Sequence, residues 1–300
     1  MLNWIPIVFG SYFLFAVSNI FDKVLRSNFV KNSFTLVILN GSISFVIGAI
    51  LVLSRPIILA APNLPLIVIS GALSTIAAMV YFIALSKSEV SRIIPILISV
   101  LPIFVLILGY AFLGEALTQF QFLAFILIVS GGVVISIQKV KGAFKLTMSF
   151  WLMLLSAFLY AVSTVILKYG LQSSNFYTTQ AIFQIGAFVG ALLILAYCIA
   201  TKRIKLRMLA YRPKAVIIAS ANQVIYFSGR LIYNVALTIA PVALVVSFGG
   251  FQGLYILALT VLLSLYFSGI LKEEIKRDII LVKLSALGLM IVGVAILAYM

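Results

Sequence analysis

The chain has 300 residues, of which 64% are hydrophobic and 9% are charged. A soluble protein of this length cannot bury so much apolar surface, so the composition excludes a soluble globular class and indicates a membrane protein. The formal net charge of +15 does not indicate a nucleic-acid partner, because the basic residues are strung along loops rather than gathered on one folded face.

Ten apolar stretches follow one another along the chain, with short loops between them. A transmembrane helix needs about 20 such residues to cross the hydrocarbon core of a bilayer. We expect the spans at about 3–21, 33–53, 64–85, 91–113, 118–137, 148–168, 176–200, 213–237, 241–267 and 279–299. Few residues remain for a soluble domain, so fold and function must both lie within the helix bundle.

The first and sixth of these stretches share a sequence. The segment from Ser11 to Lys23 recurs 145 positions later, from Ser156 to Lys168, and seven of the thirteen positions are identical. The second copy lies five spans after the first, an odd number, so it must cross the membrane in the opposite direction. We therefore predict an all-α integral membrane fold, a five-plus-five inverted repeat of residues 1–145 and 146–300 within one integrated domain.

Basic residues are distributed unevenly between the two sides of this arrangement. Eighteen of the 21 Lys and Arg residues lie at loops one, three, five, seven and nine. Short loops rich in these residues usually face the cytoplasm. The charge distribution therefore predicts that both termini lie outside the cytoplasm.

Several kinds of chemistry are excluded by the residues that are missing. The chain has no histidine, and Cys198 is its single cysteine, which excludes a Cys/His metal site, a Ser-His-Asp triad, a histidine proton relay and an internal disulfide. It has no Gly-x-x-x-x-Gly-Lys-Ser/Thr phosphate-binding loop, and no nucleophile, base or metal ligands cluster at one depth. We expect neither an enzyme nor a bound cofactor or metal.

Three segments of the first half carry a resemblance to a known family. They are Tyr81-Phe-Ile-Ala-Leu85, Phe112-Leu-Gly-Glu-Ala-Leu-Thr118 and Ile128-Val-Ser-Gly-Gly-Val-Val-Ile135. In order and spacing they resemble the EamA-type transporters of the drug/metabolite transporter superfamily. The resemblance implies a ten-helix carrier of small organic metabolites, with helices five and ten peripheral to a central cavity and both termini in the cytoplasm, the reverse of the charge-based prediction.

The second half departs from the family pattern at one place. Gly269-Ile-Leu-Lys-Glu-Glu-Ile-Lys-Arg-Asp278 replaces the Leu-Gly-Glu turn by a longer charged loop. A role for Glu115 therefore cannot be transferred to the second half by symmetry.

The sequence predicts a secondary transporter that moves a small polar metabolite, anionic or zwitterionic, through a central cavity by alternating access. A non-transporting membrane scaffold or receptor is the alternative. The expected partners are the small-molecule substrate and the lipids of the plasma (cell inner) membrane, with no nucleic acid. A coupling ion, the direction of transport and the oligomeric state are left open.

Polar side chains within the spans are the candidates for substrate contact, because each costs free energy in lipid and tends to face the bundle interior. The eighth span is the richest in them, and spacings of three and four place its members along one helical face. The candidates are Arg230, Tyr226, Gln223, Tyr233 and Asn234 from this span, and Asn19, Ser18, Tyr81, Tyr160, Ser163, Thr164 and Gln252 from others.

Arg230 is the most specific of these candidates. It lies about seven residues, or roughly 10 Å of helical rise, inside the end of its span. A guanidinium group suits an anionic or carboxylate-bearing substrate, and no carboxylate of the chain is expected near a span midpoint. The alternative is a structural arginine that reaches the interface or bonds to backbone carbonyls.

A second set of residues is predicted to take part in gating or coupling. Lys23 and Lys168 occupy equivalent places in the repeat and are expected at opposite membrane faces, while Asp22 is expected to contact Lys23 and could couple transport to protons. Pro and Gly residues allow helices to bend or approach closely. The predicted gating or coupling residues are Lys23, Lys168, Asp22, Pro95, Pro102, Gly249 and Gly253.

Overall fold

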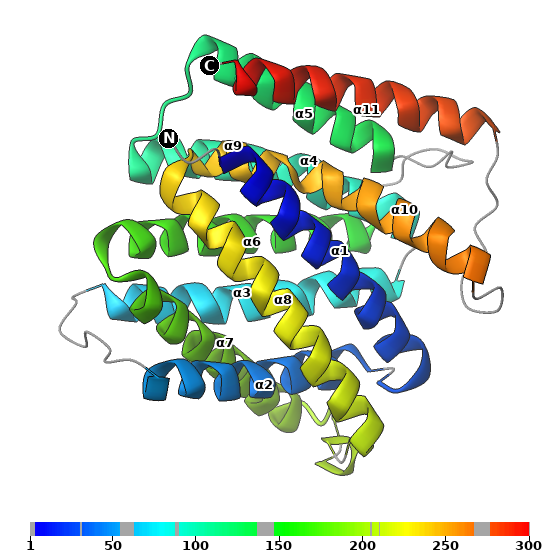
Figure 1. Cartoon of the computed structure of the whole chain (residues 1–300). Helices are drawn as coiled ribbons and strands as arrows, with labels where there is room; N and C mark the ends of the chain where they lie inside the picture. Colours follow the sequence, from blue (N-terminus) through cyan, green and yellow to red (C-terminus); the bar gives the residue numbers. More distant parts are fainter. Residues whose placement is uncertain are drawn as a thin grey trace.

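The computed structural model describes residues 4–30, 32–54, 63–87, 90–136, 147–204, 206–209, 211–266 and 277–299. Within these ranges every regular element is helical (Figure 1). The elements are α1 (Trp4–Asn28), α2 (Ser33–Ser54), α3 (Leu64–Lys87), α4 (Val90–Leu108) with the π-helical turn η1 (Gly109–Leu113), α5 (Gln119–Ser136), α6 (Met148–Ser173), α7 (Phe176–Ala200), the 3₁₀ turn η2 (Leu206–Leu209), α8 (Pro213–Ile239), α9 (Val242–Ser247), α10 (Gly249–Tyr266) and α11 (Arg277–Ala298).

The helices have the length and composition of membrane spans. Seven of the described segments are long and apolar enough to cross a bilayer, namely Trp4–Arg26, Ser33–Ser54, Leu64–Lys87, Ile96–Leu113, Met148–Ser173, Phe176–Ala200 and Pro213–Ile239. The three other predicted spans hold shorter apolar helices within the described residues, at Gln119–Val134, Val242–Ile256 and Ser285–Ala298. The prediction of a helical, multi-pass membrane protein is confirmed.

Two helices are longer than the sequence predicts. Helix α1 continues to Asn28 and α6 to Ser173, whereas the apolar runs end near 21 and 168. The prediction ended each span at its first charged residue. It was wrong there because these charged residues have polar partners on neighbouring elements, so the helix continues past them.

The bundle is built from four closely packed helix pairs. Helix α1 packs against α8, α3 against α6, α2 against α7 and α5 against α11. In Figure 1, α5 and α11 lie along one edge of the bundle and α2 and α7 towards the opposite edge, with α3 and α6 between them. Helices α1, α3, α6 and α8 make up two of these four pairs, and α1 and α8 cross in front of the others in Figure 1.

Glycine allows α3 and α7 to approach closely. A side chain on Gly71 would collide with the carbonyl oxygen of Phe183, and one on Gly186 would collide with the carbonyl oxygen of Val68. One turn further along α7, a side chain on Gly190 would lie 2.7 Å from the carbonyl oxygen of Ala72. The Gly186-x-x-x-Gly190 spacing thus serves helix packing, as small residues commonly do in membrane proteins.

The ninth predicted span is interrupted in its first half. Helix α9 ends at Ser247, Phe248 is fully buried at the break, and α10 begins at Gly249. A helix end leaves backbone carbonyls without intrahelical partners. The hydroxyl of Tyr12 on α1 lies 3.2 Å from the carbonyl oxygens of both Val245 and Val246 and donates to them, so α1 holds the break in place.

Candidate functional site

Arg230 lies on α8, nine residues before the end of this helix at Ile239. Its Nη1 donates to the hydroxyl of Tyr226, one turn earlier, over 3.0 Å, and its Cζ lies 3.9 Å from the ring centroid of Phe183 on α7. The Nε atom is buried and has no hydrogen-bond partner among the described residues. The cation is therefore held by a phenol and an aromatic ring, and one of its donors is unused.

Aromatic rings from α1 pack against the tyrosines of α8 that lie one turn on either side of this arginine. Phe15 lies 5.3 Å from Tyr226 and 5.9 Å from Tyr233, measured between ring centroids. Tyr12 meets Tyr233 edge to face at 6.0 Å. The rings make a rigid, mostly apolar wall with polar hydroxyls at its margin, as in many sites for small molecules.

Tyrosines of α3 and α6 complete this group. Tyr160 on α6 lies close enough to Tyr226, Tyr81, Arg230 and Asp22 to interact with each of them electrostatically. Four helices, α1, α3, α6 and α8, therefore bring polar and aromatic side chains towards one region. We call the group of Tyr81, Tyr160, Tyr226, Arg230 and Tyr233 the arginine–tyrosine cluster.

A buried amide pair joins α7 and α8 one turn beyond Arg230. Asn234 Nδ2 donates to Gln180 Oε1 over 3.0 Å, and the two side chains are 0% and 1% exposed. Gln180 Nε2 and Asn234 Oδ1 lack hydrogen-bond partners among the described residues. The pair fixes the side of α8 that carries Arg230 against α7.

Asp22 connects α1 to α8 through a different amide. Asn222 Nδ2 donates to Asp22 Oδ1 over 2.8 Å, and the side chain of Lys23 is exposed. The expected contact between Asp22 and Lys23 is thus replaced by a bond between helices. Since α1 extends to Asn28, Asp22 lies further inside its helix than the sequence predicts.

Lys168 is buried in an ion pair. It is 3% exposed, and its Nζ lies 2.5 Å from Glu115 Oε1. The same Nζ donates to the carbonyl oxygen of Ala240 over 2.5 Å, and Glu115 Oε2 accepts from the N–H of Val242 over 2.6 Å. The ion pair and the backbone bond supply the polar partners that let Lys168 be buried, so this lysine does not extend into its surroundings as a snorkelling lysine would. Its place at a membrane face stays a prediction.

The backbone turn before Glu115 explains how the carboxylate reaches Lys168. Helix α4 ends in the η1 turn, and Gly114 follows with φ of +68°. Only glycine adopts this left-handed conformation without strain. The Leu-Gly-Glu turn therefore directs Glu115 towards α6 and the junction of α8 and α9.

Comparisons with known proteins identify a family for the first half of the chain. Residues 2–137 match the EamA-like transporter family. These residues are an EamA-like transporter domain. No curated protein matches the sequence.

The EamA-like domain covers α1 to α5, and the fold of the whole chain has known counterparts. Solved structures of 27 chains match it. One of them, the crystal structure of a protein, aligns over 97% of this chain and 94% of its own length, with a TM-score of 0.67 and 17% sequence identity. At that identity the likeness establishes a shared fold. The family match implies that the protein is a membrane transporter and not an enzyme. The multi-pass helical structure agrees with this.

The EamA-like domain and the second half both contribute to the site. The domain supplies Tyr12, Phe15, Asp22 and Tyr81, and the second half supplies the remaining groups, with Arg230 among them. Two other predicted substrate contacts are engaged elsewhere: Ser163 Oγ donates to the carbonyl oxygen of Ser70 over 2.8 Å, and Thr164 Oγ1 to that of Tyr160 over 2.8 Å.

The remaining predicted residues lie around the arginine–tyrosine cluster or apart from it. Ser18 and Gln223 are buried, Gln252 is partly buried on α10 and Asn19 is exposed. Two of the predicted gating residues belong to α4: Pro102 is buried, and the side chain of Pro95 lies outside the described residues. The other two belong to α10, which Gly249 begins and which has Gly253 in its first turns.

Several residues of the site were not predicted from the sequence. Phe15 and Phe183 touch Tyr226 and Arg230, but a phenylalanine in an apolar span carries no signal that separates a site from lipid contact. Asn222 shares the face of α8 that carries Tyr226 and Arg230, four and eight residues later, but its position in the sequence does not reveal what its amide bonds to. Its carboxylate partner, Asp22, lies 200 positions earlier in the chain, so this bond can be recognised only in the folded protein.

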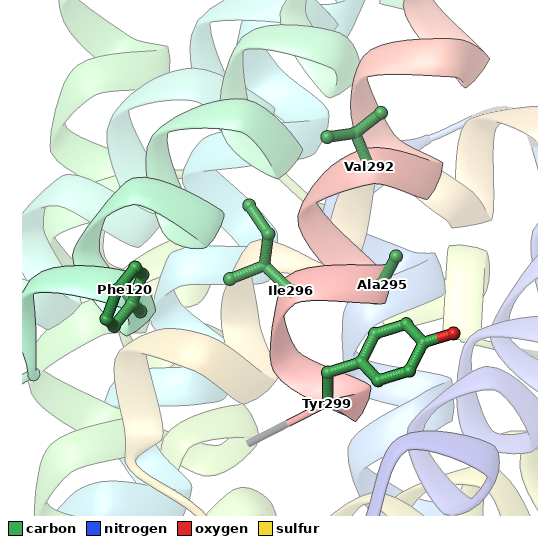
Figure 2. A pocket seen from close by; sticks show the side chains of 5 residues that line it. All are labelled: Phe120, Val292, Ala295, Ile296 and Tyr299. Carbon is green, nitrogen blue, oxygen red and sulfur yellow. The ribbon is translucent and has the colours of Figure 1, made fainter.

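A hollow of about 440 Å³ between α5 and α11 is separate from this region. It is lined by Phe120, Val292, Ala295, Ile296 and Tyr299, and Figure 2 shows these side chains on the two peripheral helices. Its lining is almost wholly apolar, as expected for a surface between helices that faces lipid. It offers no polar group to orient a metabolite except the Tyr299 hydroxyl, which Figure 2 shows pointing away from the other lining residues.

Proposed function

We propose that this protein is a secondary carrier of a small polar organic metabolite that bears an anionic group, alone or as part of a zwitterion. The observation that carries the proposal is Arg230, whose guanidinium lies among α7 and α8 side chains with an unused donor at Nε. We assign the carrier to the plasma (cell inner) membrane, where such proteins exchange metabolites with the cytoplasm.

The energetics of Arg230 favour an anionic ligand. A charged side chain near the centre of a transmembrane helix costs about 2.5–3.5 kcal/mol on insertion scales. A phenol and an aromatic face offset part of this cost, but neither carries a formal charge. A carboxylate of the substrate would supply the missing charge and could bind the guanidinium through two parallel hydrogen bonds.

The pairing of helices supports an inverted repeat as the basis of movement. If α1 to α5 correspond to α6 to α11 in order, the α1–α8 pair corresponds to the α6–α3 pair, and both are closely packed. In the α2–α7 pair and in the α5–α11 pair, the two helices are each other's counterparts in the two halves, and both pairs are closely packed. A structure in which residues 1–145 and 146–300 exchange roles in this way can open alternately to the two sides of a membrane.

The site lies where the two halves meet, as alternating access requires. Tyr81 and Phe15 come from the first half, and Tyr160, Tyr226 and Arg230 from the second. Rocking of one half against the other would change the distances between these side chains. The Lys168–Glu115 ion pair, which also joins the two halves, would act as a contact of a gate at one end.

Binding of acidic metabolites to the purified protein tests the proposed substrate class. Small carboxylates and amino acids should raise the thermal unfolding midpoint, because a ligand at 100 times its Kd stabilises the folded state by about 2.7 kcal/mol. The methyl esters of the same compounds, which lack the anion, should have little effect. Equal stabilisation by esters, or by amines without an acid group, would contradict an anionic substrate.

A further inference from the structure

The bond between Asp22 and Asn222 leaves one buried atom unsatisfied. Asn222 is 2% exposed, and its Nδ2 donates to Asp22 Oδ1 over 2.8 Å. Its own carbonyl oxygen, Oδ1, has no hydrogen-bond partner among the described residues. A buried acceptor without a donor costs about 1–3 kcal/mol, so the pair as it stands is incomplete.

One proton would complete this pair. An ionised carboxylate only accepts hydrogen bonds, whereas a protonated carboxyl also has an O–H that donates. A carboxylic acid and a primary amide side by side can exchange two hydrogen bonds, amide N–H to acid C=O and acid O–H to amide C=O. The donor that Asn222 Oδ1 lacks is therefore the one that Asp22 acquires on taking up a proton.

We propose that Asp22 and Asn222 form a proton-binding site between α1 and α8, in which protonation of Asp22 closes a reciprocal acid–amide pair. In the proton-loaded state α1 and α8 are joined by two hydrogen bonds. Loss of the proton leaves one bond and a carboxylate beside the amide carbonyl. Proton uptake thus tightens the α1–α8 contact and proton release loosens it.

The groups around Asp22 are compatible with a site that gains and loses a proton. On α1, Arg26 interacts electrostatically with the carboxyl, but its guanidinium lies over the ring of Phe82, 5.2 Å from the centroid. Tyr81 on α3 and Tyr160 on α6 also interact with Asp22. Among the described residues no cation forms an ion pair with this carboxylate.

The other two elements packed against α1 place their titratable groups away from Asp22. On α8, Tyr226 and Arg230 lie one and two turns beyond Asn222 and bond to each other. On α10, Tyr255 meets Phe13 of α1 edge to face, with 5.5 Å between the ring centroids. Phe13 lies more than two helical turns before Asp22 on α1, so Tyr255 is far from the carboxyl. Asn222 is thus the α8 group that faces the carboxyl directly.

The position of the proton site suggests what it controls. Asn222 and Arg230 lie on the same helix, eight residues or about 12 Å apart along the axis. A proton that changes how α8 packs on α1 therefore acts on the helix that carries the arginine–tyrosine cluster. Resting on the proposed carrier function, this makes the protein a proton-coupled transporter, with Asp22 as the coupling residue.

Infrared spectroscopy of the purified protein tests the proton site without any substrate. The chain has two aspartates, Asp22 and Asp278, so ¹³C-aspartate labelling shifts the carboxyl band of these two residues alone. We expect a labelled protonated-carboxyl C=O band that appears as the pH is lowered, is lost in Asp22→Asn and persists in the matched control Asp278→Asn. A titrating band that is unchanged in Asp22→Asn would overturn the proposal.

Thermal unfolding of the same variants gives a second readout. Asn at position 22 can form the reciprocal amide pair without a proton, so Asp22→Asn should unfold at a midpoint that no longer falls as the pH rises. Asn222→Leu retains Asp22 but removes the amide, and its carboxyl band should move to the frequency of a carbonyl without a hydrogen bond. An unshifted band in Asn222→Leu would contradict the acid–amide pair.

The two proposals can fail separately. If no acidic metabolite binds but the aspartate band titrates as described, the proton site stands and the carrier function falls. If acidic metabolites bind and no such band titrates, the carrier function stands and Asp22 is not a proton site.

Discussion

Replacing Arg230 by alanine is expected to abolish transport of the acidic substrate while the protein still folds. A hydrogen bond to a charged group contributes about 1.5–3 kcal/mol, which corresponds to a loss of substrate affinity of roughly 10- to 150-fold. Arg230→Lys should retain a fraction of the activity, because it keeps the charge but loses the planar fork of donors. Initial uptake rates in proteoliposomes measure both effects.

The control for this prediction is another polar residue on the same helix. The hydroxyl of Ser228 donates to the carbonyl oxygen of Val224 over 2.9 Å, within α8 itself. Ser228→Ala should therefore transport as the unmodified protein does. Equal rates for Arg230→Ala, Arg230→Lys and the unmodified protein would refute a role for Arg230 in recognition.

Glu115→Gln is expected to lower the free energy of unfolding by about 3–5 kcal/mol, the usual cost of leaving one partner of a buried ion pair uncompensated. The glutamine carbonyl can still accept from the N–H of Val242, so the change removes mainly the charge opposite Lys168. The double variant Glu115→Gln/Lys168→Met should be more stable than Glu115→Gln alone, because it leaves no isolated buried charge. Unfolding by SDS in mixed micelles provides the measurement.

Lys23 provides a matched comparison, since it aligns with Lys168 in the repeated sequence segment and its side chain is exposed. Lys23→Met should change the free energy of unfolding by no more than about 0.5 kcal/mol, as is usual for surface substitutions. If Glu115→Gln were as mild as Lys23→Met, the ion pair would not contribute to the stability of the fold.

The helices were predictable from the sequence because lipid imposes a simple rule on them. A span needs about 20 apolar residues, and all ten predicted stretches contain helix in the described structure. The rule fails at the ends of α1 and α6, where Asp22 and Lys168 are charged. Their partners, Asn222 and Glu115, lie 200 and 53 positions away in the chain, and no local pattern connects residues so far apart.

The candidate site was predictable only in part, for a similar reason. The helical spacing of polar residues on α8 indicates the face that carries Tyr226, Arg230 and Tyr233. It says nothing of which apolar-looking helix lies opposite, so the contact between Arg230 and Phe183 of α7 emerges only from packing. Polar residues that bond to backbone, such as Ser163, cannot be distinguished by sequence from those that could face a substrate.

The repeated sequence segments do not predict the surroundings of their matching residues. Lys23 and Lys168 are equivalent in the repeat, yet one is exposed and the other is buried in an ion pair. The difference follows from Glu115, whose Leu-Gly-Glu turn has no counterpart in the second half. The repeated sequence therefore does not decide which groups meet; the positions where its two copies differ do.

Counterflow into proteoliposomes tests the carrier function most directly. Vesicles that contain the purified protein are loaded with an unlabelled carboxylate metabolite, diluted, and supplied with the same compound at trace concentration in radiolabelled form. An alternating-access carrier should accumulate the label transiently, and vesicles with Arg230→Ala should not. Entry of label no faster than into protein-free vesicles, for every carboxylate and amino acid of a metabolite panel, would contradict the account.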